Sequence, residues 1–228
     1  MAEHLGLAPE AVGDVVLVKR SVDGRRRPPR WLANYRVELT GGPDAEDRLL
    51  QRRLHGVRRF TERDERRLLV GDERPMKRQA WPAQVRPIIV GAGPAGLFAA
   101  LRLGEAGAPA VLLERGAPVE DRHHDVRAFW RRAVLDPESN VVFGEGGAGA
   151  FSDGKIYTRR RDGELGWIFR RLVDHGADPA VLEEGWAHLG TDRIREILPR
   201  LRARLGELGV DMRFRACVES FIVEGGRC

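Results

Sequence analysis

The feature that most constrains this chain is a glycine-rich turn that directly follows a short apolar run. Residues 88–96 read Ile-Ile-Val-Gly-Ala-Gly-Pro-Ala-Gly, which contains the spacing G-x-G-x-x-G. The apolar run predicts a buried parallel strand over 87–90, and the small residues after it predict a helix over 94–106. A second apolar run, 110–113, ends at Glu114. This order predicts an α/β fold whose β-α-β unit binds a dinucleotide.

Each residue type in the turn has a physical reason. Gly91 permits the tight turn off the strand, Gly93 lets a pyrophosphate approach the backbone, and Gly96 lets the helix pack closely on the strand. Pro94 suits the first helical turn because its missing N–H has no intrahelical acceptor there. Ala95 lies in the same turn, where free N–H groups and the helix dipole attract phosphates.

Glu114 lies 18 residues after Gly96, at the end of the second predicted strand. A carboxylate at this point accepts hydrogen bonds from the hydroxyls of the adenosine ribose and repels the 2′-phosphate of NADP. The alternative is a glycine-rich turn of some other α/β domain, with Glu114 merely exposed. The order of the elements favours the nucleotide site.

The motif resembles a known group of proteins. Residues 91–116 resemble the FAD-binding start of glutathione-reductase-type flavoproteins, and 19–27, 137–155 and 188–192 resemble a family of largely uncharacterised bacterial FAD-dependent dehydrogenases. The resemblance implies a Rossmann-like FAD-binding domain, and Pro94 with the pair Glu114-Arg115 favours FAD over NAD. It implies an oxidoreductase with an unknown substrate or electron acceptor, no assigned catalytic residue, and NAD(P)H as a candidate electron donor.

A second glycine-rich segment lies at 144–149. Four glycines in six residues free the backbone to wrap something closely, although a mobile surface loop is the alternative. The resemblance implies that this segment follows the pyrophosphate and ribityl chain of FAD. The cofactor contacts that it implies come from Gly146, Gly147, Ser152 and Lys155.

The last part of the chain predicts a helix and then a strand or hairpin. Apolar residues mark one face of a helix over 191–208, in which Thr191 is the expected N-cap and Pro199 predicts a kink. A strand or hairpin is expected over 210–223, with Cys217 buried in it. The resemblance implies that backbone groups here bind the adenine edge, with Val218 or an adjacent residue as the contact.

The N-terminal part predicts a small α+β domain over 1–72. Strands are expected at 14–19 and 31–40 with a turn at 20–30, followed by a helix at 43–55 and a short strand at 57–60. The resemblance implies a ferredoxin-like domain whose first strand is missing. A proline-containing linker at 73–86 precedes the FAD-binding domain, 87–228, which is expected to be incomplete at its C-terminus. The chain is therefore expected to be a fragment of a longer enzyme.

Charge and composition bear on two other functional classes, nucleic-acid-binding proteins and NAD-dependent dehydrogenases. Residues 1–86 carry 19 Lys and Arg against 13 Asp and Glu, which raises an alternative: a nucleic-acid-binding or sensing module with a structural flavin. Specific nucleic-acid binding is not expected, because Trp31, Tyr35 and Phe60 lie in no aromatic-rich motif. An NAD-dependent dehydrogenase is a third reading, and the 144–149 segment argues against it.

Location and metal binding are constrained by what the sequence lacks. No signal peptide and no run of about 18 apolar residues is present, so a cytoplasmic protein without membrane partners is expected. The histidines and the two cysteines form no metal-binding spacing, so no metal site is expected.

Overall fold

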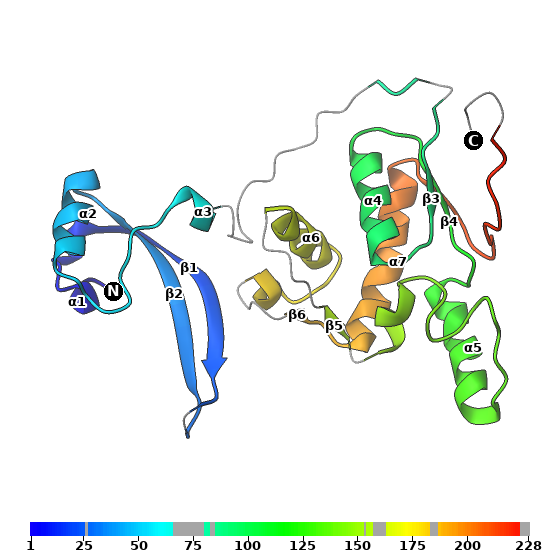
Figure 1. The fold of residues 1–228 in the computed structure, drawn as a ribbon, viewed down its shortest axis with the longest axis horizontal. Coiled ribbons are helices and arrows are strands. Elements are labelled where there is room, and N and C mark those ends of the chain that lie inside the picture. Colours follow the sequence, from blue (N-terminus) through cyan, green and yellow to red (C-terminus); the bar gives the residue numbers. More distant parts are fainter. Residues whose placement is uncertain are drawn as a thin grey trace. The chain divides into compact units, whose positions relative to one another are not determined.

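The computed structural model describes residues 1–25, 27–65, 80–82, 85–152, 154–156, 163–182 and 187–223. These residues form a mixed α/β protein that divides into two compact units (Figure 1). The first unit contains the N-terminal residues, and the second contains the glycine-rich segments. The helix α6 (Gly163–Asp174) begins in the first unit and ends in the second, and η3 (Pro179–Leu182) belongs to the first.

A long antiparallel hairpin dominates the first unit. The strands β1 (Val12–Asp23) and β2 (Arg30–Leu39) pair along their length, and α1 (Ala2–Leu5), η1 (Pro9–Ala11), α2 (Gly42–Gln51) and α3 (Glu62–Glu65) accompany them. Leu5, Leu39 and Leu49 form a small buried core. Apolar burial against one end of the hairpin therefore holds this unit together.

The predicted hairpin and helix are confirmed, but two predictions for this unit are wrong in detail. The strands extend into the predicted turn, because Val22 and Trp31 are strand-forming residues that pair directly. No strand forms at 57–60; Val57 instead packs as part of a loop against the core. The predicted linker, 73–86, falls largely outside the described residues.

The second unit is built on a three-stranded parallel sheet in the order β3-β4-β7. Its strands are β3 (Ile88–Val90), β4 (Val111–Leu113) and β7 (Asp211–Arg213). The helices α4 (Pro94–Glu105) and α7 (Thr191–Glu207) contact each other and lie beside these strands (Figure 1). The parallel crossover from β3 through α4 to β4 is the β-α-β unit that the sequence predicts.

Shorter elements complete the second unit. The helix α5 (Val119–Arg132) contacts α7, and the helical turn η2 (Gly147–Phe151) also packs on α7. The strands β5 (Lys155–Ile156) and β6 (Ala187–His188) form an antiparallel pair. Buried apolar residues of α4 and α7 form the centre of this unit, among them Leu97, Leu101, Ile197, Leu201 and Leu205.

Some predictions for the second unit need correction. The segment 210–223 is a strand only at Asp211–Arg213, because its later residues bond to the loop after β4 rather than to a strand partner. Cys217 is exposed, so its predicted burial is wrong. Thr191 is the first helical residue and makes no cap; Gly190 is the N-cap, and α7 continues across Pro199.

The strand β3 is also less buried than predicted. Among the described residues it pairs with β4 alone, and Ile88 and Val90 are 59% and 54% exposed. No helix within the described parts of the chain is long and apolar enough to cross a membrane.

Candidate functional site

The turn between β3 and α4, residues 91–96, is called the glycine turn here. Gly91 has a φ of +96°, which favours glycine, and its N–H donates to the Leu113 carbonyl at 2.7 Å. A Cβ at Gly96 would lie 1.9 Å from the Gly91 carbonyl oxygen, so only glycine fits. A Cβ at Gly93 would meet no heavy atom within 4 Å. Two of the glycines therefore serve the fold, whereas Gly93 leaves open space where a ligand can approach.

Pro94 and Ala95 begin α4, and Gly93 is its N-cap without a capping side chain. The first N–H groups of a helix have no intrahelical acceptor, and the helix dipole adds positive potential there. The open space beside Gly93 thus adjoins a site suited to an anion.

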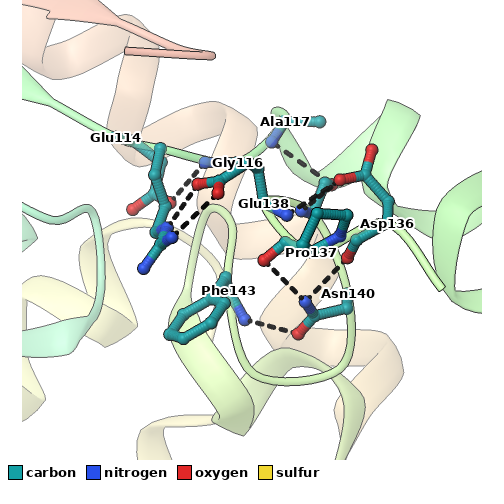
Figure 2. Close-up of polar contacts among 10 residues, drawn as sticks. Glu114, Gly116, Ala117, Asp136, Pro137, Glu138, Asn140 and Phe143 are labelled. Carbon is teal, nitrogen blue, oxygen red and sulfur yellow. Dashed lines mark hydrogen bonds and ion pairs between the residues drawn. The ribbon is translucent and has the colours of Figure 1, made fainter. Parts of the chain in front are cut away.

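Glu114 holds the end of β4 against the glycine turn. Its side chain is buried and accepts backbone hydrogen bonds from Ala92 at 2.7 Å and Gly116 at 2.8 Å. Figure 2 shows the carboxylate of Glu114 beside Gly116. Each carboxylate oxygen has two lone pairs, so Glu114 retains capacity for ligand hydroxyls. The alternative of a merely exposed Glu114 is wrong.

The second glycine-rich segment, residues 144–149, is called the glycine loop. The Gly146 N–H donates to the Ala92 carbonyl at 2.8 Å. A Cβ at Gly147 would lie 3.5 Å from both Gly93 Cα and Pro94 Cδ. The structure therefore brings together the two glycine-rich segments that the sequence separates by about fifty residues.

Two buried charges that the sequence analysis did not identify lie behind the glycine loop. Arg122 of α5 is fully buried, and among the described residues its guanidinium donates only to backbone carbonyls of 140–147. Burial lowers the pKa of Arg122 to about 10, although Glu114 and Glu145 oppose this shift. Arg122 therefore remains a cation at neutral pH.

Glu145 is the second buried charge, and it belongs to the glycine loop itself. Its Oε2 accepts from the Val119 N–H at 2.8 Å and from Arg202 Nη1 at 2.9 Å. Its Oε1 is buried without a hydrogen-bond partner among the described residues. Burial raises the pKa of the Glu145 carboxyl, and the Val119 N–H and Arg202 offset only part of this rise.

Arg115, a predicted cofactor residue, makes a bidentate ion pair with Glu138. The Nε–Oε2 and Nη2–Oε1 distances are 2.6 and 3.0 Å, and the guanidinium lies 4.3 Å from the centre of the Phe143 ring. Glu138 belongs to a turn in which the Asn140 side chain bonds backbone groups on both sides (Figure 2). Arg115 thus joins the end of β4 to the segment that leads into the glycine loop.

The predicted adenine-binding segment also lies beside the end of β4. The Arg215 N–H donates to the Gly116 carbonyl at 3.0 Å, and the Ala216 N–H donates to the Glu114 carbonyl at 2.9 Å. Val218 is half-buried two residues further on. The backbone around Val218 therefore reaches the side of the site where Glu114 lies.

The remaining predicted residues lie after the glycine loop. Ser152 is exposed, and its Oγ is 3.5 Å from the Gly149 carbonyl. Lys155 lies in β5, and its side chain is outside the described residues. Within the described ranges, no group of three His, Cys, Asp or Glu residues is arranged to hold a metal ion.

Comparison with known proteins bears on the cofactor. Residues 84–226, more than half of the chain, match the family described as FAD binding domain. The chain belongs to this family. FAD is therefore the cofactor of this domain.

One relative matches the chain over its full length, but its description names no activity. An uncharacterised protein of Clostridium beijerinckii is 31% identical over all 228 residues, which correspond to 41% of its own length. The chain thus spans less than half of that protein.

Proposed function

We propose that this chain is the FAD-binding part of a flavin-dependent oxidoreductase, more narrowly a dehydrogenase. The observation that carries the proposal is the hydrogen bond from Gly146 to Ala92, which joins the glycine loop to the glycine turn beside the start of α4. FAD supplies the redox chemistry when bound, and the protein binds and orients it.

Different elements of the chain are proposed to bind different parts of FAD. The N–H groups at the start of α4, around Gly93 and Ala95, bind the pyrophosphate, and the Glu114 carboxylate binds the adenosine ribose. The glycine loop, with Gly146, Gly147 and Ser152, follows the pyrophosphate and ribityl chain. These assignments are supported by the shared position of both segments at the carboxyl ends of β3 and β4.

Two further contacts complete the proposed site. Backbone groups near Val218 bind the adenine edge. The hydrogen bond from the Ala216 N–H to the main-chain carbonyl of Glu114, the residue proposed to bind the ribose, supports this contact. Arg115 shapes the same end of the site through its ion pair with Glu138. Lys155 is proposed as a nearby cation from the sequence alone.

The rest of the proposal concerns the whole protein. NAD(P)H is the proposed electron donor, and the location is the cytoplasm. The N-terminal unit is proposed to be a ferredoxin-like variant, which its antiparallel hairpin and packed helix support. This unit is not proposed to recognise nucleic acid specifically.

The absorbance spectrum of the purified chain, before and after titration with FAD, tests the proposal. We expect flavin bands in the near-ultraviolet and blue, and bleaching of these bands when NADH or NADPH is added without oxygen. Failure to bind FAD would overturn the assigned site. Bound FAD that stays oxidised with both nucleotides would refute only the proposed donor.

A further inference from the structure

Arg122 is the most deeply buried cation of the described residues, with a relative exposure of 0%. Its Nε donates to Asn140 O at 2.8 Å, and its Nη2 donates to Val141 O at 2.9 Å. Its Nη1 donates to both Glu145 O at 2.7 Å and Gly147 O at 2.8 Å. One guanidinium thus binds four carbonyls at the two ends of a single chain segment.

These contacts set the course of the glycine loop. Two of the four carbonyls, those of Glu145 and Gly147, flank Gly146 on either side. Gly146 is the residue whose N–H bonds to Ala92 of the glycine turn. A displacement of the loop away from Arg122 would therefore also break the contact between the two glycine-rich segments.

The tightness of this packing limits how the loop can adjust. A Cβ at Gly144 would lie 2.4 Å from Arg122 Cδ, and a Cβ at Gly146 would lie 2.5 Å from Leu198 Cδ1. Arg122 and α7 thus confine the loop from two sides. The face of the loop at Gly147, by contrast, lies toward Gly93 and Pro94, where the cofactor pyrophosphate is expected.

We propose that Arg122 is a positioning residue for FAD, which holds the glycine loop at the separation from the glycine turn that the bound pyrophosphate requires. The proposal rests on the proposed function of both segments in FAD binding. Its chemistry depends on the planar fork of donors in arginine, because a lysine ammonium presents one point of attachment to carbonyls that lie in different directions.

A simple anchor for the fold is the competing explanation. It predicts that cofactor affinity falls only as far as general stability falls. The positioning role predicts a loss of FAD affinity under conditions in which the variant is fully folded, and recovery when guanidinium donors are returned to the cavity.

The experiment measures the FAD dissociation constant by flavin fluorescence for the wild-type chain, Arg122→Lys and Arg122→Ala, at a temperature where circular dichroism shows each to be folded. Arg122→Ala is also titrated with methylguanidinium, and with methylammonium as the control cation. The matched stability control is Leu205→Ala, which opens a cavity in α7 at a fully buried residue without changing a hydrogen bond of the loop.

We expect FAD to bind about 10- to 100-fold more weakly to both Arg122 variants. Methylguanidinium should restore part of the loss in Arg122→Ala, methylammonium should not, and Leu205→Ala should bind FAD as the wild type does. If Arg122→Ala does not fold, Arg122→Lys alone decides, and wild-type affinity in it overturns the proposal.

Two other results would also overturn the proposal. One is an equal loss of affinity in Leu205→Ala at matched melting temperature. The other is a complete lack of methylguanidinium rescue in a folded Arg122→Ala. Absence of FAD binding by the wild-type chain would instead refute the proposed function, and this inference with it.

Discussion

Replacing Gly93 with valine separates cofactor binding from folding more cleanly than any other change in the site. Gly93 has φ −73° and ψ 178°, an extended conformation that valine adopts readily. A Cβ there would meet no heavy atom within 4 Å. The added Cβ therefore causes no clash, and the free energy of unfolding should fall by about 1 kcal/mol, because valine is a poorer N-cap of α4 than glycine.

The effect on FAD should be far larger. The valine side chain would occupy the space through which the pyrophosphate reaches the N–H groups at the start of α4. Hydrogen bonds to charged groups contribute about 1.5–3 kcal/mol each, so losing two of them costs about 3–6 kcal/mol. Since each 1.4 kcal/mol is a factor of ten, affinity should fall by at least about a hundredfold.

The assay combines a FAD titration with thermal unfolding followed by circular dichroism. Gly206→Val is the matched control, because Gly206 is an exposed residue of α7 whose added Cβ also meets nothing within 4 Å. Gly93→Val should fold as this control does, with a slightly lower melting temperature, and should differ from it strongly in FAD affinity. A folded Gly93→Val variant that binds FAD like the control would refute the assignment of the pyrophosphate to this turn.

Three further substitutions test other parts of the site. Glu114→Ala should weaken FAD about tenfold or more and leave FMN unaffected, and should also lower stability by about 1–3 kcal/mol for each buried N–H left without an acceptor; unchanged FAD affinity would count against the ribose contact. Gly96→Ala should lower the free energy of unfolding by about 2 kcal/mol or more, since its Cβ would collide with the Gly91 carbonyl, and a wild-type denaturation midpoint would contradict this. For Glu145→Gln, the free energy of unfolding is measured over a series of pH values. Burial raises the pKa of Glu145 in the folded protein, so the stability that this carboxyl contributes is complete below its unfolded pKa and is lost as the pH rises through the folded pKa. The unfolding free energy of the variant relative to wild type should therefore increase as the pH rises above about 4.3, the ordinary pKa of a glutamate, and a difference that is constant with pH would contradict the raised pKa.

The sequence predicts those parts of the fold whose hydrophobic pattern and glycine spacing match their place in the folded structure. The β3-α4-β4 unit follows from two apolar runs and the glycine spacing, and α7 follows from its apolar face. The predicted turn at 20–30 is too long: Asp23-Gly24 and Pro28-Pro29 in this stretch favour a turn, but Val22 still pairs with Trp31. Backbone segments such as 214–223 lack a strand partner, and the composition of a segment does not reveal this.

The site was predicted less completely than the fold. The roles of the glycines can be predicted from their spacing, because the tight turn that requires glycine is formed by residues close together in the sequence. Arg122 and Glu145 could not be read in this way, since Arg122 lies in a helix that is otherwise rich in charged and exposed residues. The burial of both charges depends on a loop that returns from further along the chain. The only sequence signal near Glu145 is its place between glycines.

The way in which Arg122 holds the glycine loop has a consequence for variation in this protein. Its four acceptors are main-chain carbonyls, which every amino acid supplies. These hydrogen bonds therefore depend on the path of the main chain, and a side chain is excluded only at Gly144 and Gly146, where a Cβ would collide with Arg122 and Leu198. Val142, whose side chain is 56% exposed, lies inside the clamped segment and makes none of these contacts. Exposed positions of this segment such as Val142 are thus open to substitution, while the course of the backbone stays constant.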